Sequence, residues 1–224
     1  MTARALVLGL DTCTFWLNLA LLDGRGGLVG ALHERVATHA TGLVPAILAL
    51  LDRAGASPEG LAAVGVVTGP GSFTGLRVGL AAALGLARAR GTPAYGLDSL
   101  TALALAYGRE GEGIALLDAR RGQVYCRRFR ARAGSLESLS EPEALDPADA
   151  LPAGVELAWA VGDGVPLLPV LPGSCFSAPD IPNLALPAAR SALARLSAGE
   201  PGDTLHALYV RAPDAAMPPG RRAR

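Results

Sequence analysis

The chain contains no lysine, and its basic charge comes from arginine. A phosphate-binding P-loop needs a lysine followed by serine or threonine after its second glycine, so that class of nucleotide site is excluded. Basic and acidic residues balance to a formal net charge of zero. No overall electric field therefore draws this protein toward nucleic acid or toward a membrane.

Cysteine and histidine are also scarce, with three residues of each type. The cysteines form no Cys-x-x-Cys pair, so neither a zinc site nor a disulfide framework is expected. Isolated cysteines are usually small buried side chains of proteins in reducing compartments. No two histidines stand at the spacing of metal ligands, so we expect no metal and no cofactor. These residues are Cys13, Cys126, Cys175, His33, His39 and His206.

Long hydrophobic runs are missing as well. The run at residues 5–10 ends at Asp11 and is too short to span a membrane, and it lacks a secretory cleavage pattern. We expect a cytoplasmic protein without membrane contact. Half of the 224 residues are hydrophobic, which is ample for one large domain or two small ones.

What the chain does have is a glycine-rich turn between a strand and a helix. Residues 64–67 predict a buried strand, residues 69–71 (Gly-Pro-Gly) interrupt it, and residues 76–90 predict a helix. Such a turn points backbone N–H groups at one spot, which suits an anion. A tight corner with nothing bound explains the same residues, and a carboxylate at the end of the first strand can simply cap it. The anion-site candidates are Asp11, Gly69, Gly71 and Ser72.

The order of the predicted elements in the first half indicates the fold. Three strands joined by short turns form an antiparallel meander, and two further strands, each preceded by a helix, suit parallel crossovers. This order is typical of the ribonuclease H-like unit of actin-like (ASKHA) proteins. We therefore predict an α/β fold with two lobes, the second one reduced. The predicted strands are Arg4–Leu10, Phe15–Leu22, Leu28–Val36, Ala62–Val67 and Ala94–Leu97, and the first helix is His39–Arg53, capped by Thr41.

The second half carries weaker signals. Asp98 is predicted to cap a helix that ends near Tyr107, and the polar break after it divides the chain into lobes of residues 1–108 and 109–224. Residues 141–187 are rich in proline and glycine, and residues 215–224 are expected to fray. The other predicted elements are the strands Ile114–Asp118, Gln123–Arg132 and Leu157–Val161 and the helix Ala188–Ser197.

The predicted hairpin at residues 114–132 is rich in arginine. Together with its tyrosine and phenylalanine, these arginines could contact RNA phosphates. Glutamates follow closely in the sequence, so a solvated, charge-balanced face explains them better, and any RNA contact is expected to be indirect or weak. The arginines are Arg120, Arg121, Arg127, Arg128, Arg130 and Arg132.

Several segments together resemble one bacterial family. The most specific is Thr68–Gly79, with the sequence TGPGSFTGLRVG. Through these segments the chain resembles the TsaB (YeaZ) family, partners of the enzyme that makes threonylcarbamoyladenosine in tRNA. Residues 133–190 match only loosely. The other matching segments are Leu8–Thr12, His39 with Leu43–Pro45, Leu117–Tyr125 and His206–Pro213.

The resemblance implies a role in modifying adenosine 37 of tRNAs that read codons beginning with A. In that system the paralogue TsaD transfers the threonylcarbamoyl group to the N6 amine, and a small ATPase, TsaE, joins the pair. TsaD holds a metal with two histidines, and the corresponding positions here are Ser99 and Leu103. The resemblance thus implies a non-catalytic subunit that activates TsaD, with self-pairing as a homodimer when TsaD is absent.

The partner surface is expected on the two helices at residues 43–51 and 76–86. Apolar and small-residue faces can complete a four-helix bundle with the same helix pair of a partner. On this hypothesis Gly79→Trp breaks pairing and leaves the monomer folded. The interface candidates are Leu43, Ile47, Leu50, Leu76, Gly79, Leu80, Ala82, Ala83 and Leu86.

Two enzyme classes remain as alternatives. A nucleotide-binding ASKHA-type kinase or ATPase would need a second phosphate loop and an adenosine-binding glycine pair, for which Gly162-Asp163-Gly164 is the only hint. A peptidase would need a base to activate a serine, and neither Ser72 nor Ser99 has a histidine nearby in the sequence.

Overall fold

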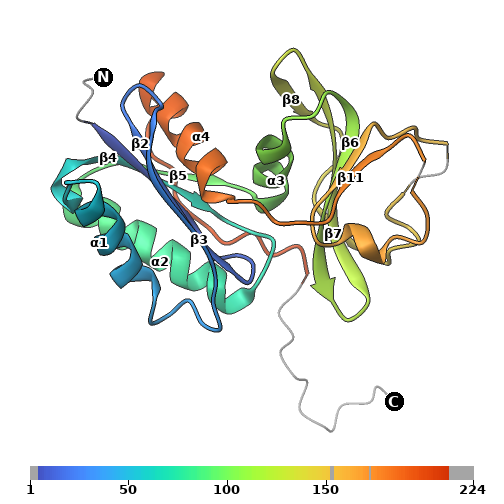
Figure 1. The fold of residues 1–224 in the computed structure, drawn as a ribbon, viewed down its shortest axis with the longest axis horizontal. Coiled ribbons are helices and arrows are strands. Elements are labelled where there is room, and N and C mark those ends of the chain that lie inside the picture. Colours follow the sequence, from blue (N-terminus) through green and yellow to red (C-terminus); the bar gives the residue numbers. More distant parts are fainter. Residues whose placement is uncertain (1–4, 152–153, 172, 212–224) are drawn as a thin grey trace, which may run out of the picture.

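A computed structural model describes residues 5–151, 154–171 and 173–211 (Figure 1). Two β-sheets stand next to each other, each with helices packed against it (Figure 1). The expected fraying of residues 215–224 concerns a segment outside the described residues. Within the described ranges, no helix combines the length and the apolar character that crossing a membrane requires.

The first sheet has the strand order β3-β2-β1-β4-β5. β1 pairs with β2 and β2 with β3 in antiparallel fashion, whereas β4 runs parallel to β1 and to β5. The predicted meander, the parallel crossovers and the actin-like fold class are therefore confirmed. The strands are β1 (Leu6–Asp11), β2 (Trp16–Asp23), β3 (Leu28–Arg35), β4 (Leu61–Val67) and β5 (Ala94–Leu97).

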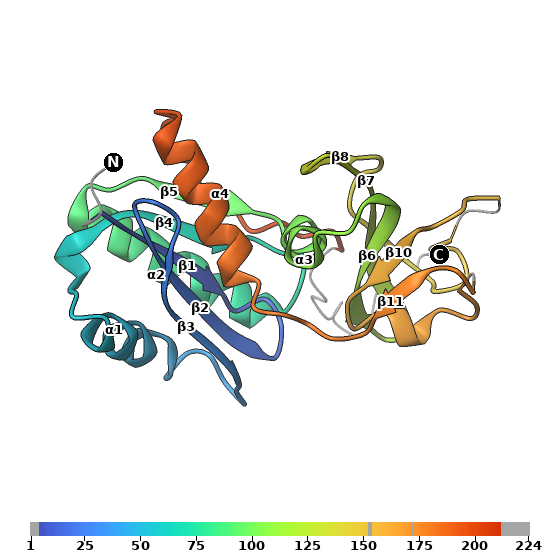
Figure 2. The same ribbon diagram turned by 45° about the horizontal axis from the view of Figure 1, so that its top comes forward.

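Helices α1 (Leu43–Arg53) and α2 (Phe73–Arg90) cover one face of this sheet (Figures 1 and 2). The prediction that the first helix begins at His39 with a Thr41 cap is wrong, because Gly42 is the N-cap and no side chain caps it. α2 begins earlier than predicted, because the Ser72 Oγ accepts a hydrogen bond of 3.3 Å from the Gly75 N–H. A short 3-10 helix, Pro58–Gly60, leads into β4.

Helix α4 (Ala185–Ser197) covers the opposite face of the first sheet, although it follows the second sheet in the chain (Figure 2). It begins three residues before the predicted start. Two glycines let its backbone approach the strands: a Cβ on Gly9 of β1 would collide with the carbonyl oxygen of Ala185, and one on Gly65 of β4 with that of Ala188. The division of the chain at residue 108 stays a prediction.

The second sheet has the order β11-β10-β6-β7-β8, with β9 paired to β7. Helix α3 (Ser99–Tyr107) packs against it, and the predicted cap is confirmed, since Asp98 accepts a hydrogen bond of 2.9 Å from the Thr101 N–H. The sequence did not predict β8, β9 and β11, which are three or four residues long. The strands are β6 (Gly111–Arg120), β7 (Gln123–Arg132), β8 (Ser135–Ser138), β9 (Glu143–Leu145), β10 (Trp159–Val161) and β11 (Phe176–Ala178), and a 3-10 turn spans Val165–Leu167.

The segment 200–211 has no regular structure and runs from α4 back to the gap between the sheets. The Asp203 carboxylate accepts hydrogen bonds of 2.7 Å from both terminal nitrogens of the Arg195 guanidinium, and these bonds anchor the start of the segment. Further along, the Leu208 N–H donates to the Thr68 carbonyl at 2.7 Å. Arg211 then donates to the Gln123 side chain of β7 at 3.1 Å. The segment therefore contacts both sheets.

Candidate functional site

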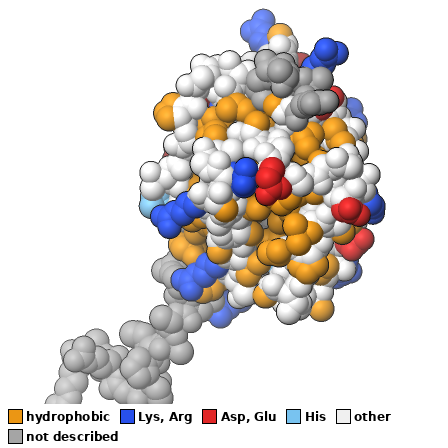
Figure 3. All heavy atoms as spheres, turned by 90° about the vertical axis from the view of Figure 1, so that its left-hand side faces the viewer, with side chains coloured by type: hydrophobic (Ala, Val, Ile, Leu, Met, Phe, Trp, Pro, Cys, Tyr) orange, Lys and Arg blue, Asp and Glu red, His pale blue; other side chains and the backbone are white. Residues whose placement is uncertain are grey.

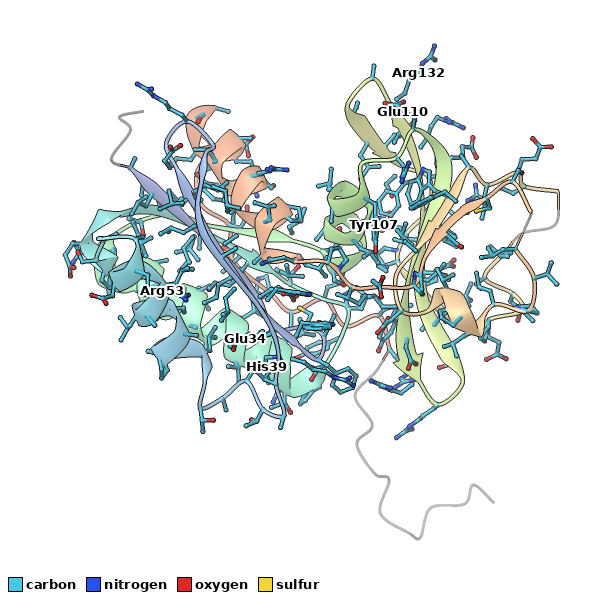
Figure 4. The ribbon with its side chains drawn as sticks, in the orientation of Figure 1. Glu34, His39, Arg53, Tyr107, Glu110 and Arg132 are labelled. Carbon is cyan, nitrogen blue, oxygen red and sulfur yellow. The ribbon has the colours of Figure 1, made fainter. Side chains whose placement is uncertain are left out.

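A cleft of about 890 Å³ opens between the two sheets. Its wall on the first sheet comes from the segments that follow β1 and β3 and from the glycine turn with the start of α2. Its wall on the second sheet comes from the β6–β7 hairpin and from Asp163. His39, at the end of the first lobe near the second, is one of the lining residues (Figure 4). The lining also includes Cys13, Phe15, Gly71–Gly75, Leu117–Arg120, Tyr125, Tyr209 and Arg211.

The glycine turn is held from two sides. From the end of β1, the Cys13 carbonyl accepts a hydrogen bond of 2.7 Å from the Ser72 N–H. From the start of α3, the Ser99 N–H donates to the Gly69 carbonyl at 2.7 Å, and the Ser99 hydroxyl donates to the Pro70 carbonyl at 2.6 Å. The turn is therefore a fixed part of the cleft wall, joined to strand β1 and helix α3.

The glycines of α2 lie in two different environments. The Thr12 hydroxyl donates to the Gly75 carbonyl at 2.7 Å, and a Cβ on Gly75 or Gly79 would collide with Thr12. Gly85, by contrast, has no heavy atom within 4 Å of the position that a Cβ would take. The close contact at the start of the helix is thus made within the chain. A tryptophan at Gly79 would collide with Thr12 inside the first sheet's own packing, so Gly79→Trp is expected to disturb the folding of the monomer as well as any pairing.

The four anion-site candidates do not all reach the cleft. Gly71 and Ser72 line it. Gly69 has a φ of 104° and lies against the carbonyl oxygen of Leu208, so its backbone belongs to the buried side of the turn. Asp11 is fully buried and does not line the cleft. The capping interpretation of Asp11 fits the structure, because its carboxylate accepts a hydrogen bond of 2.8 Å from the Cys13 N–H.

Asp11 belongs to a short polar chain that reaches the surface. The Asn18 amide donates to the Asp11 carboxylate at 2.7 Å, and its oxygen lies 2.6 Å from Nδ1 of His33. Burial raises the pKa of the Asp11 carboxyl above its ordinary value of 3.8, although the hydrogen bonds from Cys13 and Asn18 oppose that rise. Burial also raises the pKa of the Cys13 thiol, so no thiolate is favoured there.

The raised pKa of Asp11 predicts a pH dependence of stability. Because the folded state favours the protonated carboxyl, the contribution of Asp11 is fully present below pH 3.8 and is lost as the pH rises through the folded-state pKa. The free energy of unfolding of the wild type should therefore fall, relative to that of Asp11→Asn, as the pH rises from about 4 toward neutral. Urea melts of both proteins across this range measure the difference. A difference that grows in the opposite direction would mean that the folded state favours the carboxylate.

The structure does not support a metal site or an activated serine at the positions that the sequence raised for them. Ser99 and Leu103 are fully buried in the interior. Among the described residues, no three His, Cys, Asp or Glu side chains are grouped so that they could hold a metal ion. Ser72 and His39 line the same cleft, although they are far apart in the sequence. The Nε2 of His39 lies 3.2 Å from the Trp16 carbonyl oxygen.

Several arginines of the hairpin are paired with acids. Arg130 contacts Glu112 at 2.6 Å, and Arg120 contacts Asp118 at 2.9 Å. Arg127 lies 3.0 Å from Asp98, the cap of α3, and its side chain is only 17% exposed. These pairs fit the charge-balanced face better than a continuous phosphate-binding stripe.

The sequence did not predict that aromatic side chains gather at the cleft. Two of the four phenylalanines and two of the four tyrosines line it, namely Phe15, Phe73, Tyr125 and Tyr209. The rings of Phe73 and Tyr209 lie 5.4 Å apart, although the residues are far apart in the sequence. Only the fold brings them together, so no local pattern could have signalled the group.

The interface candidates lie mostly on the inner faces of α1 and α2. Seven of them are buried, and Ala82 and Leu86 are partly exposed. The apolar stripe of an amphipathic helix faces its own core, which explains the misplacement. The outer faces carry other apolar side chains, with Val44 56%, Leu48 50% and Leu84 36% exposed. Hydrophobic side chains gather on the side of the molecule that bears α1 (Figure 3). The buried candidates are Leu43, Ile47, Leu50, Leu76, Gly79, Leu80 and Ala83.

Comparisons with known proteins agree on one group of relatives. Residues 23–180 match the family model described as TsaD, tRNA N6-adenosine threonylcarbamoyltransferase. The tRNA threonylcarbamoyladenosine biosynthesis protein TsaB of Bacillus subtilis is 34% identical over 59% of this chain and 58% of its own length. The Escherichia coli protein of the same name is 31% identical over 62% of this chain and 61% of its own length. The chain thus spans a little over half the length of the curated relatives that it matches. The solved structure of YeaZ from Pseudomonas aeruginosa has a TM-score of 0.78 and 26% identity, over 92% of this chain and 99% of that one.

Proposed function

Since the chain belongs to the TsaB (YeaZ) family, which functions in the biosynthesis of threonylcarbamoyladenosine in tRNA, we propose that it is a non-catalytic subunit that activates a TsaD-type transferase. The transferase moves the threonylcarbamoyl group to N6 of adenosine 37 in tRNAs that read codons beginning with A. The chain acts by pairing with this paralogous enzyme, and a TsaE-type ATPase joins the pair.

One observation supports the pairing: apolar side chains are exposed on the outer face of α1 and α2. Val44 and Leu48 are four residues apart on α1, so they project from the same side of the helix. Both are at least half exposed, and no acidic or basic side chain stands between them in the sequence. Ala81, Leu84 and Gly85 give α2 a matching exposed strip of apolar and small residues. Two such helices can complete a four-helix bundle with the corresponding pair of a partner, or with a second copy of the chain.

A second candidate, a nucleotide-binding kinase or ATPase, is favoured by one observation. Asp163, flanked by two glycines, lines the cleft together with the glycine turn on the other lobe. Its carboxylate accepts a hydrogen bond of 2.9 Å from the Asp118 N–H, and burial raises its pKa. Asp163 therefore has a structural partner already, which favours a role in holding the hairpin over one in catalysis.

The test of the proposal is reconstitution of tRNA modification. A transcript of a tRNA that reads codons beginning with A is incubated with the matching TsaD-type and TsaE-type proteins and threonylcarbamoyl-adenylate, with and without this chain. We expect modified adenosine only when the chain is present, and neither product nor ATP hydrolysis from the chain alone. Equal product without the chain would refute the proposal. Turnover of nucleotide by the isolated chain would favour the kinase alternative.

A further inference from the structure

The exposed aromatic rings of the protein converge on one place. Phe15, Phe73 and Tyr209 are 47%, 40% and 41% exposed, and all three line the cleft between the lobes. Every other phenylalanine, tyrosine and tryptophan of the chain is buried or only partly exposed. Full burial of a large apolar side chain is worth about 1.5–3 kcal/mol, and each of these partly exposed rings forgoes a share of it, so three of them at one site favour a binding surface.

Arginines pack on these rings from both lobes. The Arg120 guanidinium lies 4.4 Å from the centre of the Phe15 ring, and that of Arg35 lies 5.9 Å from it. Arg77 lies 3.9 Å from the centre of the Phe73 ring and donates a hydrogen bond of 3.3 Å to the Tyr209 hydroxyl. Aromatic rings bind cationic groups when their faces are free. Here arginines already lie over the Phe15 and Phe73 rings, so the cleft offers a guest the planes of these guanidinium groups and the part of the ring surface that stays exposed. Their positive charge disfavours a cationic guest.

The cleft is lined by two aspartates and two arginines, so positive charge is in excess only beside the exposed rings. Asp118 pairs with Arg120 at 2.9 Å, and Asp163 accepts a hydrogen bond of 2.9 Å from the Asp118 N–H. Arg35 and Arg77 add positive charge beside the exposed rings. Arginine planes and aromatic rings are both stacking platforms for nucleobases, and arginine also pairs with phosphate. The shared chemistry is therefore that of a nucleotide, a planar base that carries a phosphate.

We propose that this cleft binds unpaired nucleotides of RNA, with bases stacking on Phe15, Phe73 and Tyr209 and phosphates paired with the arginines beside them. The platforms lie in the turn between β1 and β2, at the start of α2 and in the segment 200–211, so they suit several consecutive nucleotides better than a single free one. The absence of lysine also removes the usual clamp for the phosphates of a free nucleoside triphosphate. This inference deepens the proposed function, from which it takes a tRNA as the partner.

The test is direct binding by the isolated chain. A fluorescently labelled RNA stem-loop with an unpaired loop is titrated with wild type, Phe15→Leu, Arg35→Ala and Arg132→Ala, and anisotropy is recorded at several salt concentrations. Arg132 is the matched control, because it is also an exposed arginine at a strand end but lies at the far end of β7 from the cleft (Figure 4). Thermal melts establish that each variant is folded.

We expect Phe15→Leu to weaken binding of the stem-loop about tenfold, because a stacking platform is lost. Arg35→Ala should reduce the slope of log affinity against log salt by about 0.7, the value for one phosphate contact to a single strand, whereas Arg132→Ala should leave the slope unchanged. A fully paired RNA of the same length should bind more weakly than the stem-loop.

Other results would overturn the inference. Equal effects of Arg35→Ala and Arg132→Ala on the salt slope would do so, as would equal affinity for paired and unpaired RNA. So would free AMP that displaces the stem-loop with the affinity of the stem-loop itself. A further contrary result is that Phe15→Leu weakens pairing with the transferase but does not change RNA binding. Failure of the proposed function is distinguishable. If the chain binds the stem-loop as expected while modification proceeds without it, the activating role falls and the RNA site stands. If Phe15→Leu binds RNA like the wild type while modification still needs the chain, the RNA site falls.

Discussion

Gly65→Ala is expected to lower the free energy of unfolding by roughly 2–3 kcal/mol, the upper part of the range of about 1–3 kcal/mol for overpacking of a dense core. The added Cβ would collide with the carbonyl oxygen of Ala188 in α4 and would lie 3.1 Å from the Ala192 Cβ. β4 is an interior strand, and neither it nor the helix backbone can move without disturbing the other contacts of α4 with the sheet. The melting temperature should fall by about 4–12 °C for a chain of this size, as measured by calorimetry.

The same substitution at Gly85 is the matched control. Gly85 lies in the interior of α2, is exposed, and has no neighbour within 4 Å of a new Cβ. Alanine has the higher helix propensity, so Gly85→Ala should raise the free energy of unfolding by up to about 1 kcal/mol. Opposite signs for one chemical change would show that the contact with α4, and not glycine as such, decides the effect. Equal small changes at both positions would mean that α4 does not pack closely on β4.

The first half of the fold could be predicted from the sequence because its signals are local. The strands are apolar runs bounded by Gly or Asp turns, and Asp98 is a polar cap directly before an apolar helix. The start of α1 was misplaced because no side chain caps it there, so Thr41 misled the prediction. β8, β9 and β11 could not be predicted because each is too short to show a period of its own and depends on pairing with β7 or β10.

The candidate site could be predicted only in part. The turn at residues 69–72 is recognisable by its glycines, but its neighbours in the cleft come from residues 36–39 after β3, the β6–β7 hairpin and the segment 200–211. Asp11 was considered as an anion-site candidate because it stands at the end of a strand, yet it is fully buried. Helix periodicity identified the apolar stripes of α1 and α2 correctly, but it cannot tell a stripe that packs on the sheet from one that meets a partner. Here the stripes named pack on the sheet.

Leu48→Glu is expected to weaken pairing with the TsaD-type transferase by roughly thirtyfold or more. Leu48 is half exposed on the outer face of α1, so glutamate there stays solvated in the free chain. In a helix-bundle interface the same carboxylate would lose its water without gaining a partner, a cost of about 2 kcal/mol or more. The affinity is measured by isothermal calorimetry with the purified transferase, and the yield of modified adenosine should fall in parallel at limiting concentrations of the chain.

Leu167→Glu provides the control, because Leu167 is 41% exposed but lies on the second lobe, away from α1 and α2. It adds the same charge at a site outside the proposed face and should leave both affinity and yield unchanged. If the isolated chain forms homodimers through this face, Leu48→Glu should make it monomeric in sedimentation at concentrations where Leu167→Glu remains dimeric. Loss of transferase pairing with the dimer intact would mean that two faces exist. If Leu48→Glu pairs with the transferase as tightly as the wild type does, the partner surface does not include the outer face of α1. The fold and the cleft do not depend on that result.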